Sequence, residues 1–561
     1  MRSSGIGLSR RRFLAGGVGL CAAAGCRTPL FASSRRLSAD YWCTWQTQCQ
    51  TKRNIQARGA VRFAGDQGGF GDRDNLNEEI LFGEGGWAAL FPEVRSDLVF
   101  LLDDGWDVPY GADGGGDGVA AFGSHVPDAV RFPSLRGTTA QKLRQLNGRV
   151  QNAGWLGAGI WVAPQMSGEV YDRPCPDWNR LTDDLKRKLS ESAEAGVLYW
   201  KVDWGVHNRD IRYRQLMSEL KASYAPDLII DHCWGVDNAM NGRPYPYDGW
   251  KASDGPLDVC GTLCRMTDNP LYDEVARRYG ELMVFSDVFR TYDTVHPMST
   301  ATALDRAVFE VECADRMRAR AVINTEDEDL MAATLGLEFS MMRSPICPPP
   351  TVPWPWNRND RMAEAVRCIR WHRIAPPFGS DRGIRLCRGD KRLEENWFFA
   401  DKSTWWSALF GREIRQTAPA VVSRGLPLPD VTSAEADGSV PFVTAGRNPS
   451  GAKSVAAIPL LTQKKGYHTP RANVVLDARL SCGEPFGAFG VFSALTVTVD
   501  APQDARVLAA DLAGGERTDI TESCPREKDR LTLPGGLLAR LGRAQNAPGD
   551  PSSPGVLVEL V

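Results

Sequence analysis

Segments with helical spacing of apolar residues alternate with short apolar runs over the first two thirds of the chain. Residues 181–196 repeat apolar side chains at helical spacing and end on Gly196, which suits a helix C-cap. Residues 138–154 form a second such segment between a threonine and a glycine. Short apolar runs follow at 156–162 and 197–203, and they predict buried strands. This alternation is the pattern of successive βα units.

The number of predicted strands indicates a closed barrel. Between about residues 39 and 350 there are enough strands for an α/β protein with an eight-stranded (β/α)8 TIM barrel. The first strand lies beside Trp42, and a further helix is predicted around 211–220. The remaining predicted strands are 98–102, 228–231, 282–287, 320–324 and 337–342.

The pattern changes after a proline-rich segment that begins at Pro345 and cannot continue a helix or a central strand. Beyond residue 385, short strands are separated by Gly, Pro and Asp turns, which predicts a C-terminal antiparallel β-sandwich. We therefore expect a signal segment at 1–35, a catalytic barrel at 36–384 and the β-sandwich at 385–561. The clearest strands of the sandwich are 495–499, 506–515 and 556–560.

The N-terminus has the features of an export signal. Residues 9–14 read Ser-Arg-Arg-Arg-Phe-Leu and precede a short apolar stretch that ends near Gly25, an order that resembles the twin-arginine signal. We expect export to the periplasm or the cell exterior. Cys26 follows small residues, so a lipid anchor at this cysteine is a second possibility. No apolar run approaches the roughly 20 residues of a membrane span.

Composition favours a neutral ligand. The chain has 66 Lys and Arg against 69 Asp and Glu, and no basic block lies beyond the N-terminus, so a nucleic-acid partner is not expected. Its 17 tryptophans suit the apolar faces of sugar rings, although they also serve as core side chains. The 561 residues exceed what one core usually supports, so two or more domains are expected. Oligomeric state is left open.

The 14 cysteines show no disulfide framework and no zinc spacing. Cys260 and Cys264 are the closest approach to a motif, and we interpret them as structural or disulfide-bonded rather than as metal ligands. We expect neither a metal nor a cofactor.

Polar and aromatic residues gather where the predicted barrel strands end. The carboxyl ends of barrel strands share one face, and this face carries the chemistry of such folds. The residues placed there are Trp42 and Trp45, then Asp103, Asp104 and Trp106, then Trp161, then Lys201 and Asp203, then Asp231, Cys233 and Trp234, and finally Asp287, Arg290 and Asp293.

This set of side chains suits a pyranose. Paired carboxylates and a lysine bind adjacent hydroxyls, and a tryptophan packs on the ring. Glycosidic cleavage needs two further carboxyl groups, for which Asp203 and Asp293 are our candidates. Asp203 also fits an N-cap of the next helix, and Asp103 and Asp104 fit turn caps. Asp287 is an alternative to Asp293 for the acid/base role.

Two further polar groups are interpreted as structural or solvated. His232 is expected to be a core histidine with satisfied hydrogen bonds. Residues 326–329 are expected to form a solvated acidic loop, with Asp327 or Asp329 facing the pocket.

Three ordered motifs resemble a known family. Asp103-Asp-Gly-Trp106, Lys201-Val-Asp203 and Arg290-Thr-Tyr-Asp293 resemble the retaining glycoside hydrolases of clan D, families 27 and 36, typified by α-galactosidases (melibiases). Residues 42–45, Trp-Cys-Thr-Trp, are similar to the raffinose-synthase-like branch of family 36. The resemblance covers roughly residues 39–350.

The resemblance implies a role for each matching residue. Asp203 is implied as the nucleophile and Asp293 as the acid/base, about 5 Å apart as in other retaining enzymes. Lys201, which should also stabilise the Asp203 anion, and Arg290 are implied as sugar contacts. The remaining implied contacts are the hydroxyl-binding pair Asp103 and Asp104, and Cys233 with Trp234 in a specificity loop.

The resulting expectation is an exported enzyme that cleaves terminal α-linked sugars by double displacement. One alternative is a carbohydrate-binding barrel without catalysis. Another is a transglycosylase of the raffinose-synthase type.

Overall fold

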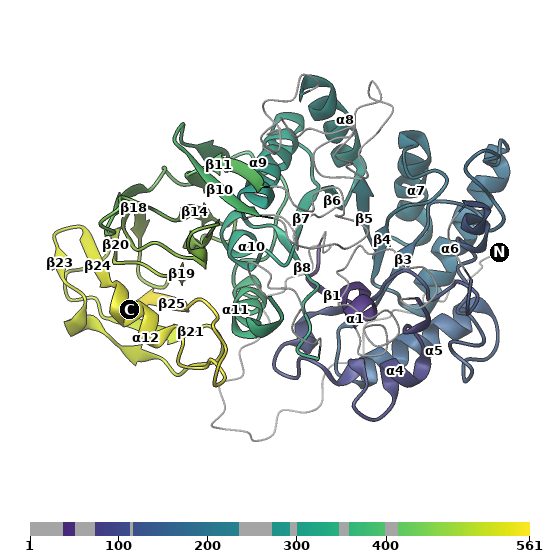
Figure 1. Ribbon diagram of the computed structural model, residues 1–561, viewed down its shortest axis with the longest axis horizontal. Helices are drawn as coiled ribbons and strands as arrows, with labels where there is room; N and C mark the ends of the chain where they lie inside the picture. The colour runs from purple at the N-terminus through teal and green to yellow at the C-terminus, as the bar shows by residue number, and fades with distance from the viewer. Residues whose placement is uncertain are drawn as a thin grey trace, which may run out of the picture. The chain divides into compact units, whose positions relative to one another are not determined.

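Eight parallel strands close into a barrel in the computed structural model, which describes residues 38–50, 73–112, 116–234, 272–291, 300–346, 358–398 and 413–561. The strands follow chain order around the barrel, and β1 closes it by pairing with β8, Tyr41 opposite Ser340. Figure 1 shows the helices outside this ring of strands. The strands are β1 (Tyr41–Cys43), β2 (Val99–Leu102), β3 (Gly157–Val162), β4 (Tyr199–Val202), β5 (Ile229–Trp234), β6 (Val288–Thr291), β7 (Val322–Glu326) and β8 (Glu338–Met341).

The helix-terminal residues predicted from the sequence do cap their helices. Thr138 and Gln141 form a capping box at the start of α5, and α6 ends on Gly196 in the left-handed conformation (φ 71°). The expected barrel with a C-terminal β region is confirmed. The barrel helices include α1 (Trp45–Gln50), α4 (Glu78–Phe82), α5 (Thr139–Asn152), α6 (Trp178–Ala195), α7 (Ile211–Tyr224), α8 (Tyr272–Phe285), α9 (Thr300–Met317), α10 (Asp329–Leu335) and α11 (Met362–His372).

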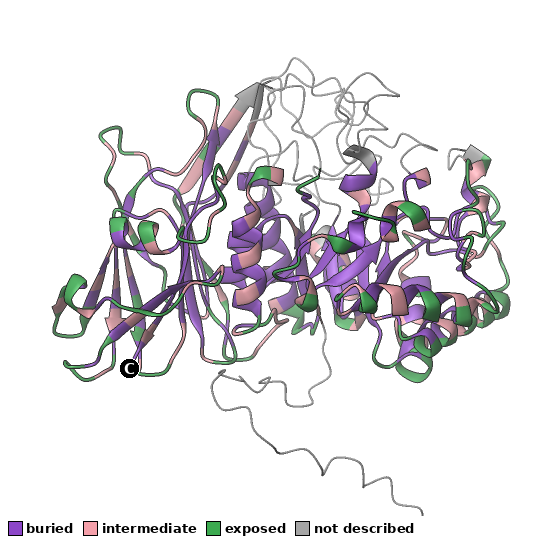
Figure 2. Ribbon diagram, turned by 90° about the horizontal axis from the view of Figure 1, so that it is seen from below, coloured by how far each residue is buried: buried purple, intermediate pink, exposed green. Residues whose placement is uncertain are grey.

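Alternate residues of each barrel strand face the interior. Tyr199 of β4 packs with interior residues such as Val99, whereas Trp200 joins the core between strands and helices. The register then places Lys201 opposite both Trp161 and Asp231. Figure 2 shows the consequence: the strands are buried throughout, while the surrounding helices have buried and exposed faces.

One predicted strand is wrong. Residues 282–285 are the last turn of α8, and β6 begins only at Val288. A short apolar run fits a buried helix turn as well as it fits a strand, so its period could not decide between them. Asp287 therefore precedes β6 and lies at the amino end of the barrel strands, away from the face that carries Asp203.

The C-terminal sheets are mixed rather than purely antiparallel. Parallel pairs such as β15 with β19 and β18 with β20 occur among antiparallel ones. The three predicted strands are present as β20, β21 and β25, and the domain boundary at 385 stays a prediction. The strands are β9 (Leu386–Arg388), β10 (Arg392–Phe398), β11 (Glu413–Pro419), β12 (Val421–Arg424), β13 (Asp430–Ser433), β14 (Phe442–Arg447), β15 (Lys453–Ile458), β16 (Leu460–Thr462), β17 (Gly466–His468), β18 (Ala472–Leu480), β19 (Phe486–Gly490), β20 (Ala494–Val499), β21 (Val507–Asp511), β22 (Thr518–Asp519), β23 (Arg526–Glu527), β24 (Arg530–Pro534) and β25 (Gly555–Leu560).

Buried polar contacts join these sheets to the barrel helices. Arg367 of α11 donates two hydrogen bonds of 2.9 Å to the carboxylate of Asp511. Arg424 donates to the carbonyl of Leu335 at the end of α10 (2.7 Å). The bidentate Arg367–Asp511 pair holds α11 in one orientation against β21, because a displaced guanidinium would lose both bonds.

Membrane-span and cysteine predictions are tested in part. Within the described ranges, no helix combines the length and apolarity needed to cross a bilayer. Eight cysteines whose side chains the structure describes, Cys43 and Cys233 among them, are free thiols. The export signal, Cys26 and the Cys260–Cys264 pair lie outside the described residues.

Candidate active site

Asp203 lies immediately after β4, buried, with one carboxylate oxygen held and the other open. Oδ2 accepts a hydrogen bond from Nε1 of Trp161 (3.0 Å). Oδ1 is buried and has no hydrogen-bond partner among the described residues. Asp203 is not a helix cap, because Asp210 caps α7. A buried carboxylate oxygen without a donor is costly, so this position is suited to a ligand.

Lys201 and Asp103 form a buried ion pair beside Asp203. Lys201 Nζ lies 2.7 Å from Asp103 Oδ2 and 3.7 Å from Asp203 Oδ2, so its main partner is Asp103. Burial opposes the charge of Lys201, but Asp103 raises its pKa well above the ordinary value. Burial likewise acts against ionisation of Asp103, yet Lys201 and a 2.9 Å bond from the Cys43 thiol lower the pKa of Asp103. The pair is therefore ionised at neutral pH.

Asp104, the second carboxylate of the predicted pair, is held by Arg73. Arg73 donates Nε and Nη2 to the two oxygens of Asp104 at 3.0 and 2.9 Å. Gly105 permits this approach: its φ is 123°, and a Cβ there would lie 3.0 Å from the Cβ of Arg73. Burial still raises the pKa of Asp104, with Arg73 opposing the rise. Arg73 lies far from Asp104 in the sequence, and no local pattern indicates it.

Arg290 contacts several polar side chains in the barrel interior. Its Nε donates to the sulfur of Cys233 (3.0 Å) and lies 3.5 Å from Asp231 Oδ2, and its Nη1 contacts Glu326. Burial raises the pKa of Asp231, while Arg290 and Lys201 oppose that rise. Oδ1 of Asp231 is buried without a hydrogen-bond partner among the described residues. Asp231 and Asp203 thus each have one buried carboxylate oxygen that accepts no hydrogen bond from the described residues.

An aromatic group surrounds Asp203 at the ends of β3 and β4. Trp204 packs 4.6 Å from Phe122 and 5.4 Å from Trp161, measured between ring centroids, and is half-buried. Tyr171 is exposed; partial burial raises its pKa, Arg209 opposes this rise and Asp203 adds to it. Trp204 and Tyr171 were missed by the sequence argument. Only the position of Trp204 directly after Asp203 could have indicated it.

Two of the predicted sugar-binding tryptophans do not line this interior. Trp42 is fully buried on the outer side of β1, where its Nε1 donates to the carbonyl of Arg343 (3.1 Å). Trp106 is buried too, and it donates to the carbonyl of Trp161 (2.8 Å). Strand alternation directs Trp42 into the helix-facing core. By contrast, Trp45 is half-buried at the start of α1 and packs against the interior cluster.

The acidic segment after β7 is buried rather than solvated. Asp327 binds Arg343 (Nε to Oδ1, 3.1 Å), and Asp329 lies 3.0 Å from the same guanidinium. The prediction that Asp327 or Asp329 faces the pocket is therefore wrong. Glu326 faces the interior instead, because β7 runs through it and alternation turns it inward with Asn324.

Two competing assignments can be decided. Asp287 binds Lys221 and Arg320 and accepts the backbone N–H of Ile230 (3.1 Å), so it is a structural carboxylate at the opposite end of the strands. His232 is a core histidine, as predicted: its Nε2 lies 2.9 Å from Ser218 Oγ and its Nδ1 accepts from Arg214.

Asp293 and the side chain of Trp234 lie outside the described residues, so their predicted roles remain predictions. No group of three or more His, Cys, Asp and Glu within the described ranges is arranged to hold a metal ion.

Comparisons with known proteins give matches only among solved structures. No family model and no curated protein matches the chain. α-Galactosidase I from Mortierella vinacea matches with 13% identity over 68% of this chain and 95% of its own, with a TM-score of 0.31. A GH27 β-L-arabinopyranosidase from Geobacillus stearothermophilus, in complex with arabinose, matches with 10% identity over 94% of this chain and 99% of its own (TM-score 0.39). An α-galactosidase from Saccharomyces cerevisiae, with raffinose, has 11% identity over 94% and 95% (TM-score 0.31).

Proposed function

We propose that this protein is a retaining glycoside hydrolase that cleaves terminal α-linked sugars, with Asp203 as nucleophile. The observation that carries the proposal is the burial and hydrogen bonding of the Asp203 carboxylate. Its carboxylate is buried, one oxygen is fixed by Trp161 Nε1, and the other has no donor among the described residues. A nucleophile needs this combination, because a fixed carboxylate with one open oxygen can attack without first losing a hydrogen bond.

The neighbouring charges suit the binding of sugar hydroxyls. Asp103 and Lys201 remain ionised as a pair, and each has hydrogen-bonding capacity beyond their mutual contact. The open oxygen of Asp231 is a further acceptor. Half-buried Trp45 and Trp204 offer aromatic faces for the apolar side of a ring. A neutral polyol satisfies these groups without adding charge.

The reaction proceeds in two displacements. In the first, Asp203 forms a bond to the anomeric carbon while the glycosidic bond breaks, and Asp293 gives its proton to the leaving oxygen. In the second, Asp293 removes a proton from water, the water oxygen bonds to the anomeric carbon, and the Asp203 carboxylate is released. Two inversions give net retention. The role of Asp293 rests on the motif Arg290-Thr-Tyr-Asp293.

The test is a panel of aryl α-glycosides (galactoside, N-acetylgalactosaminide and glucoside) with an aryl β-L-arabinopyranoside. Wild type should hydrolyse at least one with retention, read by NMR of the first-formed anomer. Asp203→Asn should lose on the order of 10³-fold or more in kcat/KM. Asp504→Asn, an exposed carboxylate in a turn of the C-terminal region, is the control and should behave as wild type. Equal turnover by Asp203→Asn, or no turnover by wild type, contradicts the proposal.

Export is the second part of the proposal. It is supported by the paired arginines at Arg10 and Arg11 and the short apolar stretch after them. Wild type should be recovered outside the cytoplasm, and Arg10→Lys/Arg11→Lys should remain inside. Equal distribution of the two would refute a twin-arginine route.

A further inference from the structure

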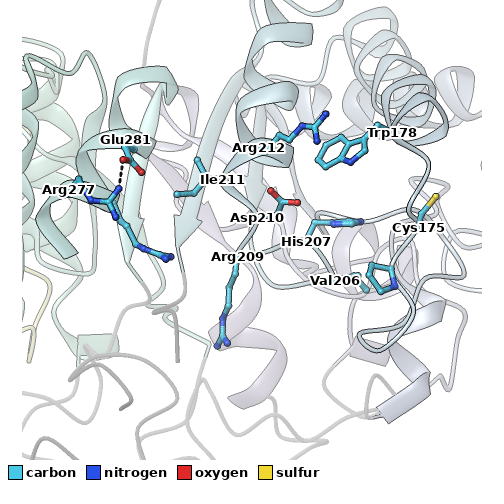
Figure 3. A pocket seen from close by; sticks show the side chains of 12 residues that line it. Cys175, Trp178, Val206, His207, Arg209, Asp210, Ile211, Arg212, Arg277 and Glu281 are labelled. Carbon is cyan, nitrogen blue, oxygen red and sulfur yellow. Dashed lines mark hydrogen bonds and ion pairs between the residues drawn. The ribbon is translucent and has the colours of Figure 1, made fainter. Parts of the chain in front are cut away.

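A groove of about 700 Å³ lies beside the candidate active site, on the loops that follow β3 and β4. It is separate from the interior that holds Asp203 and Lys201, neither of which lines it. Figure 3 shows that its walls come from three places: the β3–α6 loop with the start of α6, the β4–α7 loop with the start of α7, and the side of α8.

Positive charge predominates along this groove. Four arginines line it (Arg209, Arg212, Arg277 and Arg278), against the carboxylates of Asp210 and Glu281. Both carboxylates are engaged: Asp210 caps α7 by accepting the N–H of Tyr213 (3.2 Å), and Glu281 pairs with Arg277 at 2.5 Å.

Arg209 and Arg212 are the two cations open to a ligand. Both are exposed, and neither forms an ion pair within the part of the chain that the structure describes. The guanidinium of Arg212 lies 3.8 Å over the ring of Trp178, a contact that orients its plane. A stacked guanidinium still presents its N–H edge, and that edge matches the two oxygens of a carboxylate or sulfate.

The loop that carries Arg209 is braced. His207 bonds to Glu169 (Nε2 to Oε1, 3.0 Å) and stacks on Tyr213 with ring centroids 4.6 Å apart. Glu169 also accepts backbone N–H groups on both sides of its own loop. The two loops are therefore joined by side-chain contacts.

The groove is also close to Asp203. Arg209 follows Asp203 by six residues in the same loop, and Arg214 of α7 donates to the backbone carbonyls of Asp203 (3.1 Å) and Asn208 (2.8 Å). A chain of sugars that leaves the Asp203 site along this loop would pass to Arg209.

We infer that this groove is a subsite for an acidic sugar, one bearing a carboxylate or a sulfate ester, in the part of the substrate joined to the terminal sugar. The inference rests on the proposed function and names its substrate class: acidic oligosaccharides or polysaccharides. Figure 3 shows that Arg209 and Arg212 point to different ends of the groove, so each pairs with a negative group of its own, and a sugar ring lies beside Trp178. A nucleic acid would need a longer basic surface than this groove offers.

The test uses calorimetry on the Asp203→Asn protein, so that no probe is turned over. The probes are digalacturonate, galactobiose 6-sulfate and neutral galactobiose, titrated at low and high salt. At least one acidic probe should bind about tenfold or more tighter than the neutral one, with the advantage reduced by salt. Arg209→Gln/Arg212→Gln should remove this advantage, and Arg540→Gln, an exposed arginine on α12 (Gly535–Leu541), should not.

The outcomes separate the two proposals. Equal binding of acidic and neutral probes, or an unchanged preference in Arg209→Gln/Arg212→Gln, overturns the acidic subsite. Inorganic sulfate is titrated as a further probe. If it binds as tightly as the acidic sugar, the proposed specificity for a sugar is overturned. The hydrolase proposal fails on a different result: wild type turns over none of the aryl glycosides. The double variant should keep wild-type kcat/KM on a neutral aryl substrate.

Discussion

Replacing Trp161 by Phe tests how Asp203 is positioned. The indole Nε1 of Trp161 donates to Asp203 Oδ2 at 3.0 Å, whereas the ring packs near Phe122 (6.0 Å between centroids). Trp161→Phe removes the donor and keeps an aromatic ring. The carbonyl of Trp161 still accepts from Trp106, so the backbone stays anchored.

The size of the effect follows from the charge on the acceptor. A hydrogen bond to a charged group contributes about 1.5–3 kcal/mol, against about 1 kcal/mol for a neutral pair. At about 1.4 kcal/mol per tenfold change, kcat/KM should fall by about 10- to 100-fold. The smaller ring also leaves a cavity, so the free energy of unfolding should fall by about 1–3 kcal/mol.

Trp155→Phe is the matched control. Trp155 is also buried and also donates its Nε1, but to the carbonyl of Ala88 (2.8 Å), away from Asp203. Both variants should lose comparable stability in urea, and only Trp161→Phe should lose kcat/KM on the aryl glycoside. The reasoning is refuted if kcat/KM of Trp161→Phe stays within threefold of wild type, or if Trp155→Phe loses just as much activity.

Three further changes test other parts of the structure. Asp287→Asn removes the buried carboxylate that pairs with Lys221 and Arg320, so urea unfolding should show a loss of about 3–5 kcal/mol while kcat/KM per folded molecule is kept. A selective loss of activity would return Asp287 to the active site. Burial raises the pKa of Glu310 from 4.5 to about 7, so the folded state keeps a proton that the unfolded chain releases, and stability should fall by about 3 kcal/mol between pH 4.5 and 7. Glu310→Gln should remove that decline, and an unchanged pH dependence would contradict the assignment. Arg367→Met removes the cation that pairs with buried Asp511, which keeps the N–H donors of Ala513 and Gln545, and should lower the free energy of unfolding by about 3–5 kcal/mol. A loss below about 1 kcal/mol would show that this contact does not stabilise the junction.

Much of the barrel could be predicted because its strands and helices carry clear local signals. Gly196 ends α6, Thr138 caps α5, and Lys201 with Asp203 follows a buried strand. These features depend on residues close in sequence. Their combination places Asp203 at the carboxyl end of β4 without any knowledge of its partners.

The wrong predictions concern residues whose positions depend on contacts between segments distant in the sequence. Leu282 and Met283 are apolar because they are buried in the last turn of α8, whereas Val284 is exposed. The strand predicted from this run placed Asp287 at the wrong end of the barrel. Trp42 was assigned to the pocket although strand alternation with Tyr41 and Cys43 turns it outward. Arg73, which holds Asp104, is distant in sequence, so only the folded chain identifies it.

The most direct test of the account is to trap the covalent intermediate. Wild type is treated with a 2-deoxy-2-fluoro glycoside of the sugar preferred in the aryl panel, digested, and mapped by mass spectrometry. The account predicts one glycosyl adduct on Asp203, absent from Asp203→Asn. An adduct on another residue, or inversion of configuration with no adduct, would contradict it.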